Sequence, residues 1–139
     1  MQPVYTAVAT ARGDGRNGEV TSSDGVIDEQ LAVPKEMGGP GGEMTNPEQL
    51  FAAGYAACFH GAVRLVARKA GVDLTESSVT AEVGIGRDGG ELELAVKLIA
   101  HLPGLPQDKA GALAAQAHHV CPYSRATRGN IQVEITATT

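Results

Sequence analysis

The sequence predicts a single α+β domain over residues 1–139, in which antiparallel β-sheets pack against helices. Two glycine-containing turn signals, Asn17-Gly18 and Asp88-Gly89-Gly90, separate extended segments of the kind that pair as hairpins. A long helical pattern runs from Asn46 to Gly71, and a second one precedes the last strand. Strands that are joined by short turns run antiparallel. Because no linker divides the chain, we expect the helices to pack on the sheets within one domain.

Three strands are predicted at the start of the chain. Residues 4–11 and 19–24 carry β-branched and aromatic side chains, and Asn17-Gly18 between them suits a two-residue hairpin turn. Residues 27–33 form the third predicted strand, which Pro34 ends.

A glycine-rich loop follows these strands. Residues 37–44 contain Gly-Gly-Pro-Gly-Gly, which disfavours a helix or strand because glycine loses the most backbone entropy on ordering. A phosphate-binding loop would need Gly-Lys-Ser/Thr at the start of the helix, where Glu43-Met44-Thr45 stands instead. We therefore exclude phosphate binding at this loop.

The long helix has clear boundary signals. Asn46 is a good N-cap, Pro47 suits the first helical position, Gln49 fits a capping box, and Gly71 marks the end. About 24 residues rise about 36 Å, the width of a small domain, so this helix must be central. One apolar stripe follows the helical spacing and comprises Phe51, Tyr55, Cys58, Ala62 and Leu65.

The second half of the chain continues the pattern of strands and helices. Residues 79–87 and 91–102 form a predicted hairpin around Asp88-Gly89-Gly90. A second helix starts at Pro106 and is interrupted by Pro122, and alternating apolar residues at 131, 133 and 135 define a last strand. The expected order is three strands, a helix, two strands, a helix and a strand.

Composition excludes several classes of function. The net charge of −5, with a pI near 5.3 and only five aromatic residues, gives no basic surface for nucleic acid. The apolar run around Leu50 to Phe59 is too short to cross a membrane. The N-terminus has no secretory pattern, so we expect a cytoplasmic protein.

The two cysteines, Cys58 and Cys121, are the strongest candidates for chemistry. In a reducing compartment, such a pair is more often reactive, metal-binding or buried than a structural disulfide. A free thiol is only about 3% thiolate at neutral pH, so a nucleophile needs a cation beside it. Arg16, before the predicted turn, can supply that cation, and Glu48 can orient the guanidinium.

Taken one at a time, these residues also fit ordinary structural roles. A cysteine on an apolar stripe is more often inert core, Arg16 more often a solvated turn residue, and Glu48 a carboxylate that stabilises the start of a helix. The residues alone leave these alternatives open.

Two longer motifs resemble a known family. NPEQLFAAGYAACF at residues 46–59 and VCPYSRATRGNI at residues 120–131, with SSDG and the glycine-rich loop, are similar to the organic hydroperoxide resistance (Ohr) proteins of the Ohr/OsmC superfamily. The resemblance extends over nearly the whole chain. It implies an OsmC-like fold, an intertwined homodimer and a thiol peroxidase that acts on organic hydroperoxides.

The resemblance also implies residue roles. Cys58 is the peroxidatic cysteine, Cys121 is the resolving cysteine, and Arg16 with Glu48 activates the thiolate and positions the peroxide. Oxidation to a sulfenic acid and then a disulfide involves only thiol sulfur, so we expect no metal, haem or flavin cofactor. An external dithiol restores the enzyme, and the family implies lipoyl groups of partner proteins.

Apolar side chains near the thiol would favour alkyl or lipid hydroperoxides. As substrate-binding residues the sequence suggests Phe51, Tyr55, Phe59, Tyr123 and Met37. Ordinary core packing accounts for each aromatic side chain equally well.

The predicted helix sets a limit on this site. Ten residues separate Glu48 from Cys58, about 15 Å along one unbroken helix, too far for one guanidinium to contact both. Either the helix breaks near Gly54, or Arg16 and Glu48 of one subunit meet Cys58 of the other.

Three other classes of function remain open. Cys58, Cys121, His60 and His118 could bind zinc, although no Cys-x-x-Cys motif is present. In a cysteine hydrolase, His118 would be the base and Cys121 dispensable. A binding domain without enzymatic activity could share the same fold.

Overall fold

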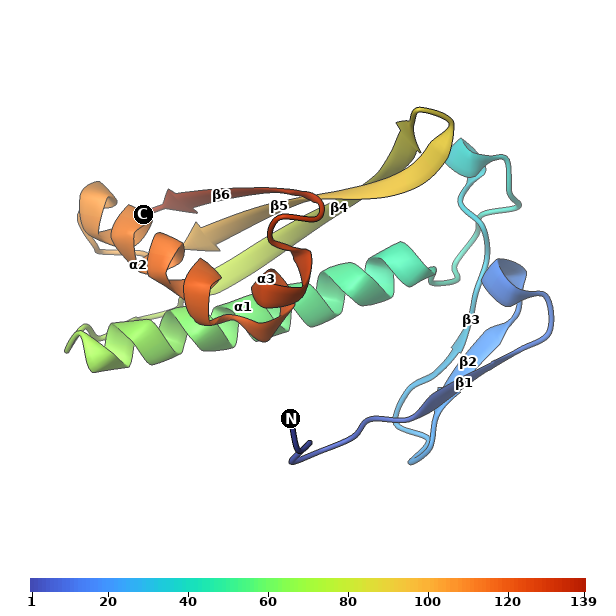
Figure 1. Cartoon of the computed structure of the whole chain (residues 1–139), viewed down its shortest axis with the longest axis horizontal. Coiled ribbons are helices and arrows are strands. Elements are labelled where there is room, and N and C mark those ends of the chain that lie inside the picture. Colours follow the sequence, from blue (N-terminus) through green and yellow to red (C-terminus); the bar gives the residue numbers. More distant parts are fainter. The chain divides into compact units, whose positions relative to one another are not determined.

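A computed structural model describes residues 1–139 and divides them into two compact units, Met1–Leu50 and Phe51–Thr139 (Figure 1). The boundary falls within helix α1 (Pro47–Lys69), which begins in the first unit and continues in the second. The sequence expectation of a single domain stays a prediction.

The first unit contains a three-stranded antiparallel sheet in the order β1-β2-β3, formed by Ala9–Arg12, Glu19–Ser22 and Asp28–Gln30. A short 3-10 helix, Lys35–Met37, follows the sheet. All three strands are shorter than predicted, because only these residues make ladder pairs. Residues 1–8 are exposed, and β-branched side chains alone do not make that segment a strand.

The turn between β1 and β2 differs from the prediction. The chain forms a 3-10 helix, Gly15–Asn17, instead of a two-residue turn at Asn17-Gly18. The Asn17 side chain accepts a hydrogen bond of 2.8 Å from the backbone N–H of Val33. Asn17 therefore ties the turn to the segment after β3, a role that its own neighbours in the sequence do not indicate.

Helix α1 has the predicted ends. Asn46 Oδ1 accepts the backbone N–H of Gln49 at 2.8 Å, as an N-cap does. Gly71 has φ +70°, and the N–H of Val72 binds the carbonyl of Ala67 at 2.9 Å, which closes the helix with a left-handed residue.

The buried face of α1 lies slightly away from the predicted stripe. Its buried residues are Tyr55, Phe59, Ala62, Val63, Val66 and Ala67. Cys58 is partly buried and lies beside this face, so it keeps access to solvent. Of the predicted stripe, Tyr55 and Ala62 are buried, and Cys58 packs against the core while its side chain stays partly exposed.

Helix α1 is also long and apolar enough, by length and composition, to cross a membrane. The core helix of a globular protein passes the same test, and six residues of α1 are buried in the second unit. The expectation that the chain has no membrane segment stays a prediction.

The second unit contains a three-stranded sheet in the order β4-β5-β6, formed by Ser78–Asp88, Glu91–His101 and Gln132–Thr138. Gly89 and Gly90 have φ +60° and +92° and form the predicted hairpin turn, since both of its central positions need positive φ. However, β6 pairs with β5 in the parallel direction, which the antiparallel prediction missed. The helices between these strands carry the chain back across the sheet and allow this direction.

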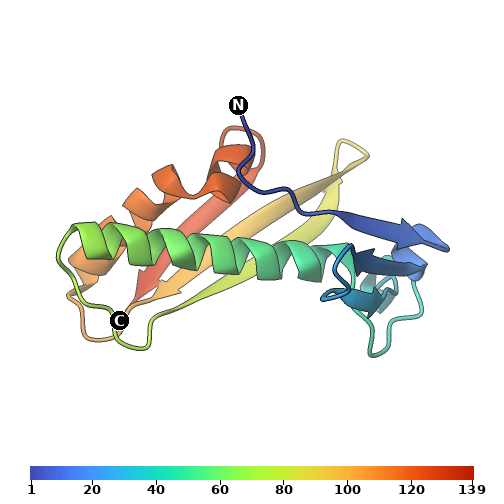
Figure 2. The ribbon, with the colours of Figure 1, turned by 90° about the horizontal axis from the view of Figure 1, so that it is seen from below.

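Two helices connect β5 to β6, namely α2 (Gln107–Val120) and α3 (Pro122–Thr127). Helices α1 and α2 cover one face of the sheet (Figure 2). Their side chains and those of β5 form the core, with Phe59, Val63, Leu98, Leu102 and Leu113 among its largest members. Helix α3 was not predicted.

Candidate active site

The two cysteines meet in the second unit. Cys121 Sγ donates a hydrogen bond to Cys58 Sγ over a distance of 3.5 Å. Both thiols are free, Cys121 is fully buried, and Cys58 is partly exposed. The partly exposed Cys58 can therefore react with a dissolved molecule. The buried Cys121 lies close enough to form a disulfide with it.

Pro122 determines where Cys121 lies. The residue before a proline is disfavoured in the helical region, and Cys121 adopts φ −67° and ψ 123°, which is extended backbone. Cys121 consequently ends α2 and caps the start of α3, with Pro122 as the first residue of the new helix. The break between the two helices places the thiol against α1.

The surroundings of Cys58 disfavour its thiolate. Burial raises the pKa of the Cys58 thiol, and the neighbouring Cys121 thiol raises it further. A hydrogen bond from the backbone N–H of Tyr123 opposes this increase. The contacts within the second unit therefore do not activate this cysteine, and a positive charge would have to come from elsewhere.

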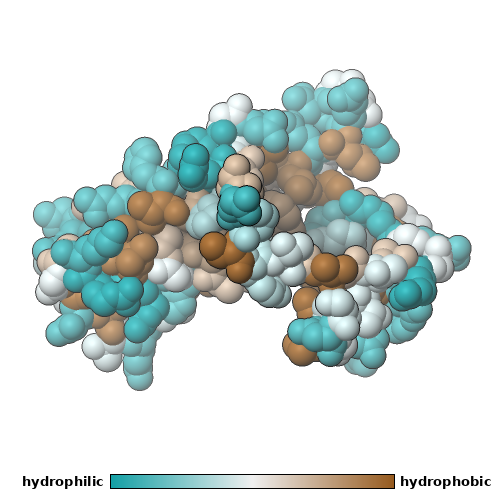
Figure 3. Space-filling model, turned by 60° about the horizontal axis from the view of Figure 1, so that its bottom comes forward, coloured by the Kyte–Doolittle hydropathy of each residue, from teal (hydrophilic) through white to brown (hydrophobic).

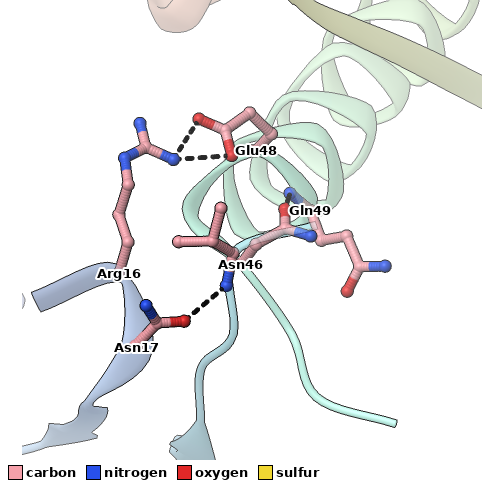
Figure 4. A network of polar contacts seen from close by, with 6 residues as sticks. Arg16, Asn17, Asn46, Glu48 and Gln49 are labelled. Atoms are coloured by element: carbon pink, nitrogen blue, oxygen red, sulfur yellow. Dashed lines mark hydrogen bonds and ion pairs between the residues drawn. The ribbon is translucent and has the colours of Figure 1, made fainter. Parts of the chain in front are cut away.

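Arg16 and Glu48 form an ion pair within the first unit (Figure 4). Arg16 Nη1 lies 2.9 Å from Glu48 Oε1 and 3.0 Å from Oε2, so one nitrogen binds both carboxylate oxygens. The Arg16 side chain is 38% exposed and that of Glu48 only 12%. The carboxylate holds the guanidinium by one corner and leaves its other N–H groups available to a ligand.

The predicted break near Gly54 is absent. Helix α1 is continuous from Pro47 to Lys69, so Glu48 and Cys58 are separated by the full axial rise of ten residues, about 15 Å. Of the two predicted alternatives, the helix break is excluded.

Three aromatic rings gather next to the cysteines. Phe51 and Tyr55 lie on α1 with ring centroids 5.9 Å apart, and Tyr123 on α3 is 6.3 Å from Phe51 and 5.7 Å from Tyr55. Gly54 makes room for this arrangement, because a Cβ atom there would lie 3.0 Å from the Tyr123 hydroxyl. The rings of Phe51 and Tyr55 belong to or pack against the same apolar cluster as the two cysteines.

Not all of the predicted substrate-binding residues have an exposed surface. Tyr123 is 40% exposed and Phe51 is partly buried, whereas Tyr55 and Phe59 are fully buried. Phe59 belongs to the core. Met37 is partly buried in the first unit, at the end of its second 3-10 helix.

Sequence reasoning missed two residues next to this site. The hydroxyl of Tyr55 lies 2.9 Å from Ser124 Oγ and 3.0 Å from Thr127 Oγ1. Both partners are buried on α3. The sequence contained one signal for them. Ser124 and Thr127 follow Pro122 and are three positions apart, so they share one face of a helix.

The structure does not support zinc binding or a cysteine hydrolase. No three His, Cys, Asp or Glu side chains are gathered where they could hold a metal ion. His60 Nε2 lies 2.9 Å from Ser77 Oγ, and the Nδ1 atom of His118 is buried without a partner. Burial lowers the pKa of His118, and no hydrogen bond connects it to either thiol.

Comparisons with known proteins agree with one another. A family model described as OsmC-like protein matches residues 39–136. An organic hydroperoxide resistance protein of Xanthomonas axonopodis pv. citri is 51% identical over 134 residues, which cover 96% of this chain and 94% of that protein.

Solved structures extend this similarity to the fold. The structure of an organic hydroperoxide resistance protein from Legionella pneumophila has a TM-score of 0.92 and 48% identity, covering 99% of this chain and 100% of that one. The structure of OhrB from Bacillus subtilis has a TM-score of 0.89 and 41% identity, covering 98% of this chain and 100% of that one. The predicted α+β, OsmC-like fold is thus confirmed.

Proposed function

The chain belongs to the OsmC-like protein family and, within it, to the organic hydroperoxide resistance (Ohr) proteins, and from this premise we propose that it is a thiol peroxidase. It reduces organic hydroperoxides to alcohols. The names of its relatives support a role in organic hydroperoxide detoxification.

The observation that carries the proposal is the 3.5 Å between Cys58 Sγ and Cys121 Sγ. The Cys58 thiolate attacks the distal oxygen of the hydroperoxide, and the O–O bond breaks. The alkoxide that leaves takes up a proton and becomes the alcohol. Cys58 is then a sulfenic acid. Cys121 attacks its sulfur, the S–O bond breaks, and water leaves as the disulfide forms. The two electrons that reduce the peroxide come from the two thiols.

Activation of Cys58 requires a cation, because its own contacts raise its pKa. Arg16 is the candidate, since Glu48 holds one corner of its guanidinium and leaves other N–H groups available to the thiolate and the peroxide. Glu48 and Cys58 are about 15 Å apart along α1, which favours a site made by two subunits of a homodimer.

The surface of one chain supports a homodimer. Apolar side chains, coloured brown in Figure 3, reach the surface among polar ones. Large apolar side chains are exposed in both units, a feature that marks protein interfaces. They include Val4, Tyr5, Val8, Val26, Ile27, Met44, Leu92 and Val120.

Regeneration requires an external dithiol and no metal, haem or flavin. Cys58 is the more exposed partner, so an incoming thiolate would attack the disulfide at the Cys58 sulfur and release Cys121. A second thiol of the same reductant then displaces Cys58. We propose lipoyl groups of partner proteins as this dithiol, in the cytoplasm, where the thiol pool is reducing.

An apolar wall suits an organic substrate. Phe51 and Tyr123 offer ring surface next to the thiols, and we propose that they contact the alkyl part of the hydroperoxide, with Met37 as a further contact. Burial of that alkyl part stabilises the complex, whereas hydrogen peroxide has no such part. The enzyme should therefore prefer alkyl or lipid hydroperoxides.

The test of the function is a thiol titration. Reduced protein receives one equivalent of cumene hydroperoxide, and its free thiols and intact mass are measured beside Cys58→Ser and Cys121→Ser. We expect the wild type to lose two thiols and two hydrogen atoms, Cys58→Ser not to react, and Cys121→Ser to stop at a sulfenic or over-oxidised species. A wild-type protein that keeps both thiols would refute the peroxidase.

A mixing experiment tests the shared site. Arg16→Ala and Cys58→Ser are each expected to be inactive as homodimers, and the two chains are co-expressed to form mixed dimers. If Arg16 acts across the interface, each mixed dimer contains one complete site, and random pairing restores about a quarter of the wild-type activity per chain. If Arg16 acts within its own subunit, no complete site forms and the mixture stays inactive.

A further inference from the structure

We propose that the hydroxyl group of Tyr55 positions the resolving cysteine, by holding helix α3 against helix α1. This inference rests on the proposed function and adds a residue to it. The sequence suggested Tyr55 as a substrate contact, but its side chain is fully buried and its hydroxyl binds Ser124 and Thr127. We call these three groups the hydroxyl cluster.

Each hydroxyl group of the hydroxyl cluster has a hydrogen-bond partner within the cluster. Tyr55 Oη lies 2.9 Å from Ser124 Oγ and 3.0 Å from Thr127 Oγ1, and Thr127 Oγ1 also donates to the carbonyl of Ser124 at 3.3 Å. All three side chains are buried, so a hydroxyl that lost its partner would have no water to replace it. The cluster therefore favours one placement of α3 on α1.

Helix α3 needs such an anchor. It has only six residues, and an isolated helix of that length is not stable in water. Cys121 is its N-cap, and the carbonyl of Cys121 accepts the N–H of Arg125 at 3.0 Å. Whatever fixes α3 therefore fixes the backbone that carries the Cys121 thiol.

The hydroxyl cluster and the two thiols use neighbouring positions on α1. Tyr55 and Cys58 are three residues apart and share one side of the helix, and their partners on the other segment are Ser124 and Cys121, also three residues apart. The hydroxyl cluster and the thiol pair thus form neighbouring attachment points. Loosening the first would widen the range of distances between the two sulfur atoms.

The consequence for chemistry is a choice between two fates of the Cys58 sulfenic acid. Attack by Cys121 gives the disulfide and water. Attack by the sulfenic acid on a second hydroperoxide gives a sulfinic acid and a second alcohol, an irreversible loss of enzyme. Correct placement of Cys121 favours the first fate.

The test measures this partition in Tyr55→Phe, which keeps the ring and removes the hydroxyl. Reduced protein is exposed to a series of cumene hydroperoxide concentrations, and the ratio of sulfinic acid to disulfide is read by intact mass. We expect the ratio to rise at least about tenfold at each concentration, because Tyr55→Phe removes both buried hydrogen bonds of the Tyr55 hydroxyl and shifts the conformational equilibrium of α3. The ratio does not depend on how fast Cys58 first reacts.

Three further variants separate positioning from general damage. Tyr5→Phe makes the same atomic change at an exposed tyrosine and should match the wild type. Thr127→Ser keeps the hydroxyl and should stay close to wild type, whereas Ser124→Ala should raise the ratio as Tyr55→Phe does. Only a role through the hydroxyl cluster predicts this pattern, because overall stability falls in any buried variant.

The outcomes are distinct. If the wild type forms no disulfide at all, the proposed function and this inference fall together. If the wild type forms the disulfide and both Tyr55→Phe and Ser124→Ala keep the wild-type ratio, only the inference is refuted. A lower ratio in these variants would also refute it, since the hydroxyl cluster would then restrain Cys121 from reacting.

Discussion

Oxidation of the two cysteines should make the protein harder to unfold. Cys58 and Cys121 are 63 positions apart, so a bond between them closes a long loop of the unfolded chain. Loss of loop entropy stabilises the folded state by about 3 kcal/mol for a 15-residue loop and about 4.7 kcal/mol for a 100-residue loop, which places this bond near 4 kcal/mol. That value is an upper limit, because any strain in the folded protein subtracts from it.

The geometry indicates that the strain is small. The two sulfur atoms start 3.5 Å apart, and a disulfide requires about 2.0 Å, so they must approach by about 1.5 Å. Cys58 is partly exposed and lies beside the packed face of α1, which leaves its side chain room to rotate. We therefore expect most of the entropic stabilisation to be retained.

The assay is urea unfolding of peroxide-treated and fully reduced wild-type protein at the same protein concentration, because subunit association makes stability depend on concentration. Cys58→Ser, treated in the same two ways, is the control and should give superimposable curves. We expect the oxidised wild type to unfold at higher urea, with a smaller slope because its unfolded chain is cross-linked. Equal or lower stability after oxidation would refute the idea that the thiols are poised for a bond.

Three further predictions concern separate parts of the chain. Gly111→Ala should stabilise the protein by about 1 kcal/mol in urea unfolding, because Gly111 is exposed within α2 and a Cβ atom there meets nothing within 4 Å; a destabilised variant would contradict the packing described. Asn46→Ala should cost about 1 kcal/mol in the same assay through loss of the 2.8 Å cap to Gln49, and Asn46→Ser should recover most of it. In a Cys121→Ser background, Arg16→Ala should move the pH profile of Cys58 alkylation by iodoacetamide to higher pH, because burial already raises the pKa of this thiol and loss of a cation raises it further; an unchanged profile would exclude Arg16 as the activating charge.

Local signals in the sequence predicted the elements whose ends depend on their own neighbours. Asn46 and Gly71 define the ends of α1 through contacts within a few residues, and Gly89-Gly90 supplies the two positive φ angles of its hairpin. Such features need no knowledge of the rest of the chain, and the structure confirms them.

The elements that were missed depend on distant partners. Helix α3 has six residues and contacts α1 through Tyr55, and Asn17 binds the distant Val33 instead of forming the predicted two-residue turn. The parallel direction of β6 likewise follows from how α2 and α3 cross the sheet. A pattern of residues along the chain does not contain this information.

The residues of the candidate site also differ in how well the sequence predicted them. The motifs around Cys58 and Cys121 identified both thiols, and the structure brings them together. Arg16 and Glu48 form the predicted pair, whereas their action on Cys58 of another subunit stays a prediction. Substrate contacts were the weakest prediction, because aromatic residues at helical spacing can equally face the core, as Phe59 does.

The aromatic cluster gives the protein an optical signal of its own. The chain contains no tryptophan and three tyrosines, so its ultraviolet emission comes from tyrosine alone. Two of the three, Tyr55 and Tyr123, lie with their rings 5.7 Å apart, and they stand three and two positions from Cys58 and Cys121 in the sequence. A change in charge or bonding at those sulfurs alters the surroundings of most of the emitting groups, so each turnover can be followed in real time without a label or a coupled enzyme.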